Sequence, residues 1–370
     1  MRGLTIERKI VRNTEYLYVS YYDPGTKGKK ELYCGPVTDS KARGRARDLE
    51  KQYLQKQLSS IHDQLKSLER ESLVEFERPF CKPFVKWAGG KSQLVAKMFK
   101  QVPETFTRYY EPFLGGAAFY FYLTRMRKDS FPATLSDINR DLINVYQVIR
   151  DDVDGLMRDL GKRQREFQKQ PNEEARSDYY YTTRDSPPNI DNERIERAGW
   201  FIFINKTCYN GLWRVNSSGA FNVPYGRPSP KVSIFEKDNL KNIHSLLNQK
   251  GVEIVWGDYA KVLENVEPNS FCYFDPPYYS ETKKGFTAYT ASLFSEKDQQ
   301  DLADLVKKLA ERGVKILVSN ADTKFIRDLY EEKGPKDMPY SYDSVEALRV
   351  INCVGSARNN KTREILIKDY

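Results

Sequence analysis

The stretch FDPPYYS at 274–280 combines an acid, two prolines and an aromatic ring in an order that suits the binding of an amino group. Asp275 ends an apolar run, FCYF, which is typical of a strand buried on both faces. Pro276 and Pro277 lack a backbone N–H, so this turn offers carbonyl acceptors without competing donors. A carboxylate and a carbonyl together suit an exocyclic amine, and Tyr278 could stack on the ring that bears it. The alternative is a rigid turn whose acid caps a neighbouring group.

Two further stretches suit a nucleoside ligand. In RYYEPFLGGAAF, Gly115 and Gly116 stand between a predicted strand and a helix, where a ligand can approach the backbone closely. The spacing is not G-x-G-x-x-G, so the dinucleotide fingerprint is absent. The next predicted strand ends in SDIN and places Asp137 where it could bond ribose hydroxyls. Glycine turns and acids at strand ends are common, so a purely structural role remains open for both.

A third stretch, FVKWAGGKS, places a ring and a cation close together. Its GKS suggests a phosphate-binding P-loop, but that motif requires a glycine where Val85 stands. One interpretation puts Trp87 and Lys91 against a bound cofactor. The other is a helix N-terminus with a buried tryptophan.

The elements that must position these residues follow an alternating pattern. Apolar or β-rich runs, which predict strands, occur at 108–113, 132–137, 252–256, 271–275 and 314–319. Helical patterns such as 139–150 and 296–312 separate several of them, which predicts an α/β fold with an open, mostly parallel, doubly wound, Rossmann-like sheet. Runs at 347–353 and 363–368 would add strands, the last of them antiparallel. The stretch from about 150 to 250 interrupts the alternation and is interpreted as an inserted domain.

The order of WAGGK, EPFLGG, SDIN, an insertion and DPPY resembles that of the Dam-like (alpha-group, D12) DNA adenine-N6 methyltransferases. The resemblance extends to FTAYTASLFS, VSNAD and SARNNKTREILI, and the inserted NKTCYNGLWRVNSSGAFNVPYGR looks like the family's target-recognition hairpin. It covers about residues 84–370. It implies a part at 84–150 that binds S-adenosylmethionine, a target-recognition domain at 151–250 and a catalytic part at 251–370.

The resemblance also implies roles for single residues. The residues that would bind S-adenosylmethionine are Trp87, Lys91, Phe113, Gly115, Gly116, Asp137, Asp258 and Asp275. Family members flip the target adenine out of the duplex, because its N6 cannot be reached in the stack. Asp275 and the Pro276 carbonyl would then hold the amino group, with Tyr278 stacked on the base. This chemistry needs no metal. Ala117 departs from the family's glycine loop, which often has a third glycine there.

Members of the family recognise a short DNA sequence, and the resemblance implies a second set of residues for this recognition. Those that would contact DNA are Lys86, Tyr209, Asn210, Leu212, Arg214 and Pro224. Arg214 resembles the arginine that reads guanine in the major groove, Lys86 would reach a second guanine, and Leu212 and Pro224 would meet a thymine methyl group. Together they match members that modify GATC. Each of these residues could instead only pack the hairpin. The wider alternatives are a DNA-binding protein with a degenerate methylase fold and a cytosine-N4 methyltransferase, which more often has Ser in place of Asp275.

Residues 1–75 lie outside the resemblance. EYLYVSYY and KELYCG are joined by DPGTKG and predict a hairpin, and a helix is predicted at about 39–73. Leucines and an isoleucine between 54 and 68 form a seam of just over two heptads, which could support weak dimerisation or pack on the hairpin. The basic cluster KARGRAR at 41–47 would suit a phosphate backbone. This arm is therefore interpreted as a DNA-binding or dimerising module.

The bulk composition agrees with a DNA-binding enzyme. The 370 residues carry a formal net charge of +9, which favours a polyanionic partner such as double-stranded DNA. Five scattered cysteines and two histidines offer no metal-ligand spacing, so we expect neither a metal site nor disulfides. No run is long and apolar enough to span a bilayer or to act as a signal peptide, so we expect a cytoplasmic protein of prokaryotic, viral or plasmid origin. A cognate restriction endonuclease would act on the same site without forming a stable complex.

Overall fold

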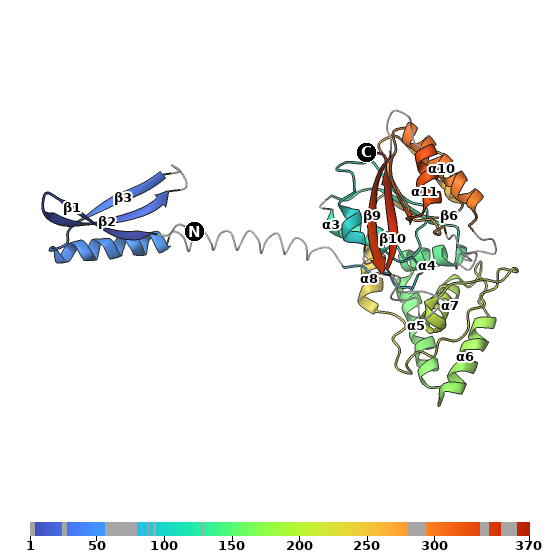
Figure 1. Ribbon diagram of the computed structural model, residues 1–370. Coiled ribbons are helices and arrows are strands. Elements are labelled where there is room, and N and C mark those ends of the chain that lie inside the picture. The colour runs from blue at the N-terminus through green and yellow to red at the C-terminus, as the bar shows by residue number, and fades with distance from the viewer. Residues whose placement is uncertain are drawn as a thin grey trace. The chain divides into compact units, whose positions relative to one another are not determined.

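The computed structural model describes residues 4–23, 28–55, 80–87, 89–91, 94–127, 129–279, 294–333, 340–348 and 361–370. They belong to two compact units, Met1–Arg78 and Pro79–Tyr370 (Figure 1). Each unit is described by itself. No helix in these ranges is long and apolar enough to cross a membrane.

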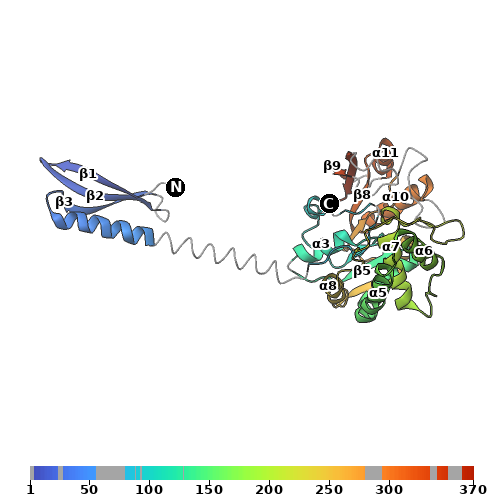
Figure 2. The same ribbon diagram turned by 90° about the horizontal axis from the view of Figure 1, so that it is seen from below.

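The first unit is a three-stranded antiparallel sheet with a helix on one face (Figure 2). Its strands, in the order β1-β2-β3, are β1 (Thr5–Val11), β2 (Thr14–Asp23) and β3 (Gly28–Pro36). β2 and β3 form the predicted hairpin, whereas β1 was not predicted. A helix at 40–55 covers the sheet, with Ala42 and Ala46 packed against Leu17 and Val19. Of the predicted 54–68 seam, only Leu54 lies within the described residues, and it is exposed.

The second unit contains the predicted open sheet, with seven strands in the order β6-β5-β4-β7-β8-β10-β9. The strands are β4 (Tyr109–Glu111), β5 (Ala133–Asp137), β6 (Val252–Trp256), β7 (Phe271–Phe274), β8 (Lys315–Ala321), β9 (Ser341–Leu348) and β10 (Lys361–Lys368). β4 to β8 run parallel, and β10 is antiparallel to both of its neighbours, as predicted. The strand predicted at 347–353 overlaps β9 by only two residues, and 349–353 lie outside the described part of the chain.

Side chains of the central strands alternate between two hydrophobic cores. In β7, Phe271 and Tyr273 join one core, while Cys272 and Phe274 join the other. This period of two is what a strand buried on both faces requires. The second core includes side chains of α10 (Glu296–Glu311) and α11 (Lys324–Lys333). The first includes α3 (Ala118–Met126) and continues into the helices of the insertion.

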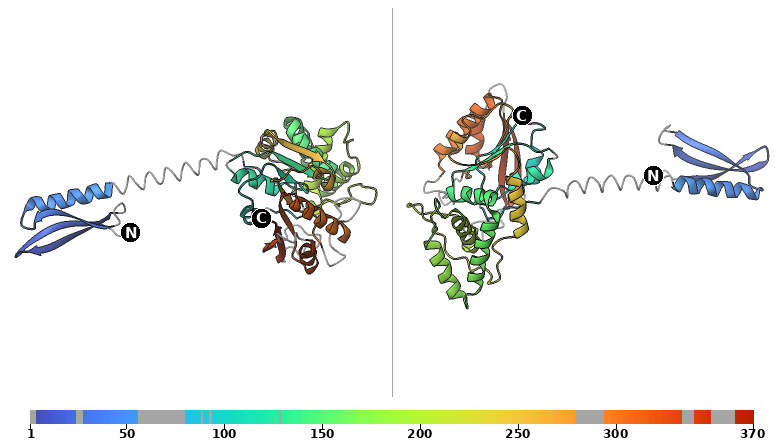
Figure 3. Two further views of the ribbon diagram at one scale, coloured as in Figure 1. Left: turned by 90° about the horizontal axis from the view of Figure 1, so that it is seen from above. Right: turned by 180° about the vertical axis from the view of Figure 1, so that it is seen from behind.

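The insertion is built mainly of helices. They are α5 (Val153–Gln168), α6 (Glu173–Asp185), α7 (Arg194–Thr207) and α8 (Lys237–Leu247). α7 packs on both α5 and α4 (Arg140–Asp151), which follows β5. Figure 3 shows these helices gathered at one end of the second unit, away from α10 and α11. The shorter elements of this unit are α2 (Val95–Phe99), α9 (Tyr259–Val262) and the 3-10 turn η1 (Tyr209–Gly211).

The strand order predicts where a ligand would bind, beyond the carboxyl ends of the parallel strands. β4 is first of these strands in the chain, β5 and β6 extend the sheet on one side of it, and β7 pairs on the other side. At such a reversal the loops that leave the two central strands diverge and open a crevice beyond their carboxyl ends. EPFLGG leaves β4 and DPPY leaves β7, so both motifs lie at this crevice.

Candidate active site

Asp275 follows β7 directly and forms a buried ion pair. Its Oδ1 lies 2.6 Å from Nζ of Lys91, and the two side chains are 18% and 4% exposed. The Ser319 hydroxyl on β8 donates to the same Oδ1 at 2.9 Å. Burial raises the pKa of Asp275, and the Lys91 ammonium and the Ser319 hydroxyl act in the opposite direction. The carboxylate is therefore held in one place by two neighbouring donors.

Tyr278 lies beside this pair with its hydroxyl anchored. The hydroxyl donates to Oε2 of Glu364 on β10 at 2.8 Å, and Nζ of Lys91 lies 4.5 Å from the centre of the ring. The Lys91 ammonium thus contacts the carboxylate of Asp275 and the face of Tyr278 at once. Nζ also donates to the carbonyl of Gly89 at 2.7 Å.

Pro277 is held in place from the neighbouring helix and strand. Nε2 of Gln299 on α10 donates to the Pro277 carbonyl at 2.8 Å, and Nδ2 of Asn320 donates to Oε1 of Gln299 at 3.0 Å. No described residue donates a hydrogen bond to the Pro276 carbonyl. This carbonyl is therefore open as an acceptor within the part of the chain that the structure describes.

A second carboxylate, Asp137, organises the glycine loop after β4. Its Oδ2 accepts from the Gly115 N–H at 3.0 Å, and its Oδ1 accepts from the Asn139 N–H at 2.9 Å. Burial raises the pKa of Asp137 to about 6, although these N–H groups and that of Ile138 act to lower it. The sequence-predicted ribose acid and glycine loop are thus brought together.

Glycine is required at 115 by conformation and by space. Gly115 has φ of +47°, in the left-handed region, and an added Cβ would lie 2.7 Å from Cδ1 of Trp87. Trp87 itself stacks near Phe201 and Trp213 of the insertion. Ala117, the departure from the family's glycine loop, adopts φ of +54° before α3 and is buried. The left-handed backbone therefore persists without the third glycine.

Phe113 and Asp258 also lie beyond the carboxyl ends of parallel strands, Phe113 after β4 and Asp258 after β6. Phe113 packs against Tyr259, with ring centres 5.2 Å apart. Asp258 follows β6 and caps α9 by accepting from the Ala260 N–H at 2.9 Å. Capping is a sufficient structural reason for this acid, so its predicted contact with a cofactor stays a prediction.

The residues predicted to read bases lie near the turn η1. Buried Asn205 on α7 joins Lys86 to this turn, because Oδ1 accepts from the Lys86 N–H and Nδ2 donates to the carbonyls of Lys86 and Gly211. Tyr209 is exposed and Asn210 adopts φ of +58°, whereas Gly211 at the end of η1 is buried. Exposed Pro224 accepts from the Tyr209 N–H at 2.8 Å.

Arg214 and Leu212 differ in how far they are available to DNA. Arg214 is half-buried, and its guanidinium donates to the side chain and carbonyl of Asn222. It would have to exchange these contacts for a base. Leu212 is only 6% exposed. Its side chain packs in the hydrophobic core, and its predicted contact with a thymine methyl group stays a prediction.

Comparison with known proteins identifies the family. The model of the D12 class N6 adenine-specific DNA methyltransferases matches residues 87–351. The chain belongs to this family. It is 43% identical over 300 residues to the type II methyltransferase M.MjaIII of Methanocaldococcus jannaschii, covering 78% of this chain and 99% of the relative. It is 35% identical to M1.LlaDCHI of Lactococcus lactis subsp. cremoris, over 81% of this chain and 99% of the relative. A DNA adenine methylase of Haemophilus influenzae is also 35% identical, over 67% of this chain and 82% of the relative.

Three residues that the D12 methyltransferase uses to build this site gained no role from the sequence. Ser319, Glu364 and Asn205 stand in VSNAD, TREILI and NKTCYNG, which the resemblance covered. A polar side chain that directly follows or precedes an apolar run, ILV before Ser319 and ILI after Glu364, was the available signal. Their partners could not be read, because each bond joins segments more than 40 residues apart.

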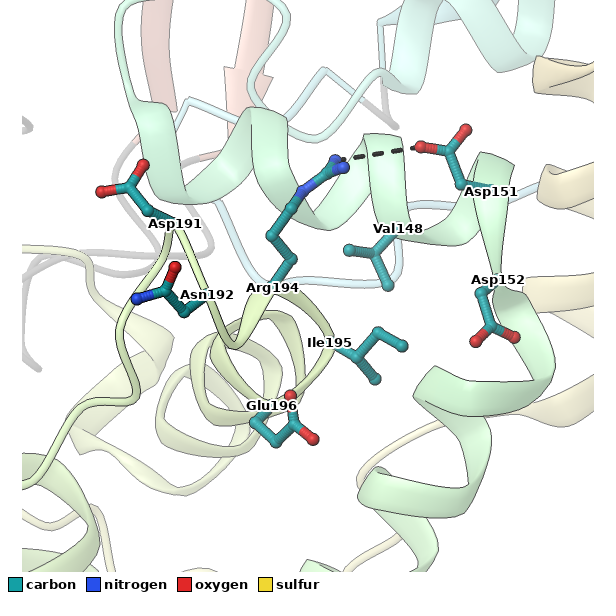
Figure 4. Close-up of a pocket in the computed structure, with 8 residues that line it drawn as sticks. All are labelled: Val148, Asp151, Asp152, Asp191, Asn192, Arg194, Ile195 and Glu196. Atoms are coloured by element: carbon teal, nitrogen blue, oxygen red, sulfur yellow. Dashed lines mark ion pairs between the residues drawn. The ribbon is translucent and has the colours of Figure 1, made fainter.

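A surface pocket of the methyltransferase lies elsewhere. It has a volume of about 340 Å³ and is lined by Val148, Asp151, Asp152, Asp191, Asn192, Arg194, Ile195 and Glu196. Figure 4 shows Arg194 reaching toward Asp151, at 3.8 Å. α4 starts just after the carboxyl end of β5, and its twelve residues run back for about 18 Å. The pocket at its far end is therefore remote from Asp275. No group of three or more His, Cys, Asp or Glu among the described residues is placed to hold a metal ion.

Proposed function

We propose that this protein transfers a methyl group from S-adenosylmethionine to N6 of an adenine flipped out of duplex DNA. The contacts of the Lys91 ammonium carry the proposal. This nitrogen donor lies 2.6 Å from Asp275 and over the ring of Tyr278. These are the contacts that the amino group of a flipped adenine would need, since the amine would donate to Asp275 and the base would stack on Tyr278. A donor already fits between the two residues.

The edge of the sheet beside Asp275 fits the cofactor. Gly115 and Gly116 stand at the strand-order reversal without side chains, and the buried Asp137 carboxylate has acceptor capacity for ribose hydroxyls. Trp87, Lys91 and Phe113 would border the same site, with Asp258 further along the edge. S-adenosylmethionine supplies an electrophilic methyl group when it is bound.

The protein's own residues position the attacking nitrogen. Asp275 and the Pro276 carbonyl accept the two N6 hydrogens, which draws the nitrogen lone pair out of conjugation with the ring and makes it more nucleophilic. Tyr278 fixes the plane of the base. Such positioning supplies most of the rate enhancement, because the reacting atoms are held in line. N6 must afterwards lose a proton. The raised pKa of Asp275 makes this carboxylate a stronger proton acceptor than an exposed aspartate.

The proposed target sequence is GATC. Lys86 and Arg214 would read its guanines, Tyr209 and Asn210 would press into the duplex beside the vacated adenine, and Pro224 would meet a thymine methyl group. Support comes from the bonds that join Lys86 to Gly211 of η1 through Asn205, and Tyr209 of η1 to Pro224. Two of the relatives are named type II methyltransferases, so we extend the proposal to a role beside a restriction endonuclease that cleaves the same site.

The test is incorporation of labelled methyl groups into matched duplexes. A duplex with one GATC should be methylated, and nucleoside analysis of the product should give N6-methyladenine. The matched control carries GATG in place of GATC. Equal labelling of both duplexes would rule out GATC as the target sequence. Detection of N4-methylcytosine would rule out adenine N6 as the methyl acceptor. A calorimetric titration that detects no S-adenosylmethionine binding would favour a DNA-binding protein with a degenerate methyltransferase fold.

Arg214→Ala should reduce the preference for GATC about tenfold or more, because a bidentate arginine–guanine contact contributes about 1–3 kcal/mol of discrimination.

A further inference from the structure

The first unit is an addition to the methyltransferase. The aligned segment spans 99% of M.MjaIII but only 78% of this chain, and the family model begins at residue 87. M.MjaIII therefore has no room for a counterpart of Met1–Arg78. The residues of the candidate active site all lie in the second unit, so the first unit must serve another purpose.

The open face of the first unit's sheet is unsuited to a polyanion. Its lysines are neutralised across the strands, since Lys29 lies 2.8 Å from Glu7 and Lys9 pairs with Glu31. The tyrosines of this face pack on one another, with Tyr33 at 5.8 Å from Tyr16 and 5.6 Å from Tyr18 between ring centres. The charged groups of this face are thus largely paired with one another, and its aromatic rings largely contact one another.

The outer face of the helix at 40–55 has a different electrostatic character. Arg43, Arg47 and Lys51 are exposed and follow one another at intervals of four residues. This spacing places them on one stripe of the helix, about 6 Å apart along its axis. None of the three forms an ion pair with another described residue. Arg45 differs from them, because its guanidinium bonds to Asp39 and to the Cys34 carbonyl.

The stripe brings like charges together, and a polyanionic partner would offset their repulsion. Like charges four residues apart destabilise a helix by a few tenths of a kcal/mol per pair. The inward side of the same helix, with Ala42 and Ala46, packs on the sheet. The outer stripe therefore offers three exposed cations in a row to another molecule.

We propose that the stripe formed by Arg43, Arg47 and Lys51 binds the phosphate backbone of duplex DNA without reading its sequence. A row of unpaired cations suits a polyanion, and a family acting on DNA brings this partner to the same chain. Because both units belong to one chain, binding by either raises the effective concentration of DNA at the other. The proposal rests on the family's DNA substrate and is independent of GATC.

The test removes the three cations from the full-length chain. The variant R43A/R47A/K51A should keep its helix, because alanine is the best helix former. Binding to a fluorescent duplex without GATC is measured across a salt series. Each lost phosphate contact should reduce the slope of log affinity against log salt by about 0.9, so the slope should become shallower by about 3. Affinity at low salt should fall by about tenfold or more.

The matched control removes three cations from the other unit. K307A/K308A/K324A lowers the net charge equally on α10 and α11, where Lys307 and Lys324 pair with Glu311 and Asp328. It should leave the salt slope within error of the parent. Equal slopes for the stripe variant and this control would overturn the proposal. So would a change in sedimentation mass of the stripe variant, which would assign the stripe to a protein contact. The assay involves no methyl transfer, so it stands whether or not GATC is the target.

Discussion

Two ion pairs of similar length show how differently the two units use charge. Lys91 and Asp275 lie 2.6 Å apart in the second unit and are 4% and 18% exposed. Lys29 and Glu7 lie 2.8 Å apart in the first unit and are 55% and 31% exposed. Water can replace either partner of the exposed pair, but it cannot reach the buried pair as readily. Burial, rather than distance, therefore makes a pair able to hold a reacting group in one geometry.

The sizes of the hydrophobic cores explain this difference. The first unit buries a few small side chains between one helix and one face of the sheet. The second unit has two layers of core around a seven-stranded sheet and can enclose Asp137, Glu111 and Lys91. A small unit buries too small a fraction of its surface to shield charges in this way. The charged groups of the first unit can therefore act only at its surface.

The largest expected effect comes from breaking each pair by the same substitution. Lys91→Met leaves the Asp275 carboxylate buried without its cation, and we expect a loss of about 3 kcal/mol in the free energy of unfolding, with methyl transfer reduced at least a hundredfold. Lys29→Met should change neither quantity measurably. Chemical denaturation and initial rates check both. If the two variants behaved alike, the contrast between the units would be wrong.

A double variant sharpens the same point. Adding Asp275→Asn to Lys91→Met removes both charges, so most of the lost stability should return while methyl transfer stays absent. Failure to regain stability would show that the lysine acts by packing rather than by charge.

A smaller effect is expected where Glu364 anchors Tyr278. Glu364→Ala and Tyr278→Phe each remove the 2.8 Å hydrogen bond, which contributes about 1 kcal/mol or a fivefold change. We expect a similar rise in KM for DNA in both variants. The fluorescence of 2-aminopurine at the target position should report weaker stacking. Glu364→Gln keeps an acceptor and should restore most of the signal. An effect of Glu364→Ala that persists in the Tyr278→Phe background would contradict the anchoring role.

The smallest effect expected is a pH dependence of cofactor affinity. With a pKa of about 6, Asp137 is about ten to one ionised at pH 7 and about ten to one protonated at pH 5. Protonation removes its charge and acceptor capacity, so the affinity for S-adenosylmethionine should fall as pH decreases through 6. Asp137→Asn should bind weakly at every pH and lose this dependence. A wild-type affinity that is flat between pH 5 and 7.5 would contradict the role of Asp137.

Much of the fold could be predicted from sequence because the central strands are short apolar runs separated by helical patterns. β5, β6 and β7 and helices α4 and α10 lie within a residue or two of their predicted ranges. β1 was missed because TIERKIV mixes charged and apolar residues on both faces, as expected of an edge strand with little burial. The position of β9 was displaced because its charged and polar residues at 341–346 conceal the strand periodicity.

The site was predictable to the extent that its chemistry resides in short motifs. Asp137 and Gly115 are joined by a direct hydrogen bond, as the pairing of SDIN with EPFLGG suggested. The bond from Ser319 to Asp275 and that from Glu364 to Tyr278 depend on which strands become neighbours, and local patterns do not contain that information. The burial of Leu212 could not be predicted, because alternation within a hairpin does not reveal which face the core covers.

Asn205 has a mechanical consequence. Its single side-chain amide forms hydrogen bonds with the N–H and the carbonyl of Lys86 and with the carbonyl of Gly211. Lys86 precedes Trp87, which packs against the glycine loop, whereas Gly211 ends the turn η1. A displacement of η1 would therefore be transmitted through this one amide to the segment before Trp87. The positions of the two segments are mechanically coupled.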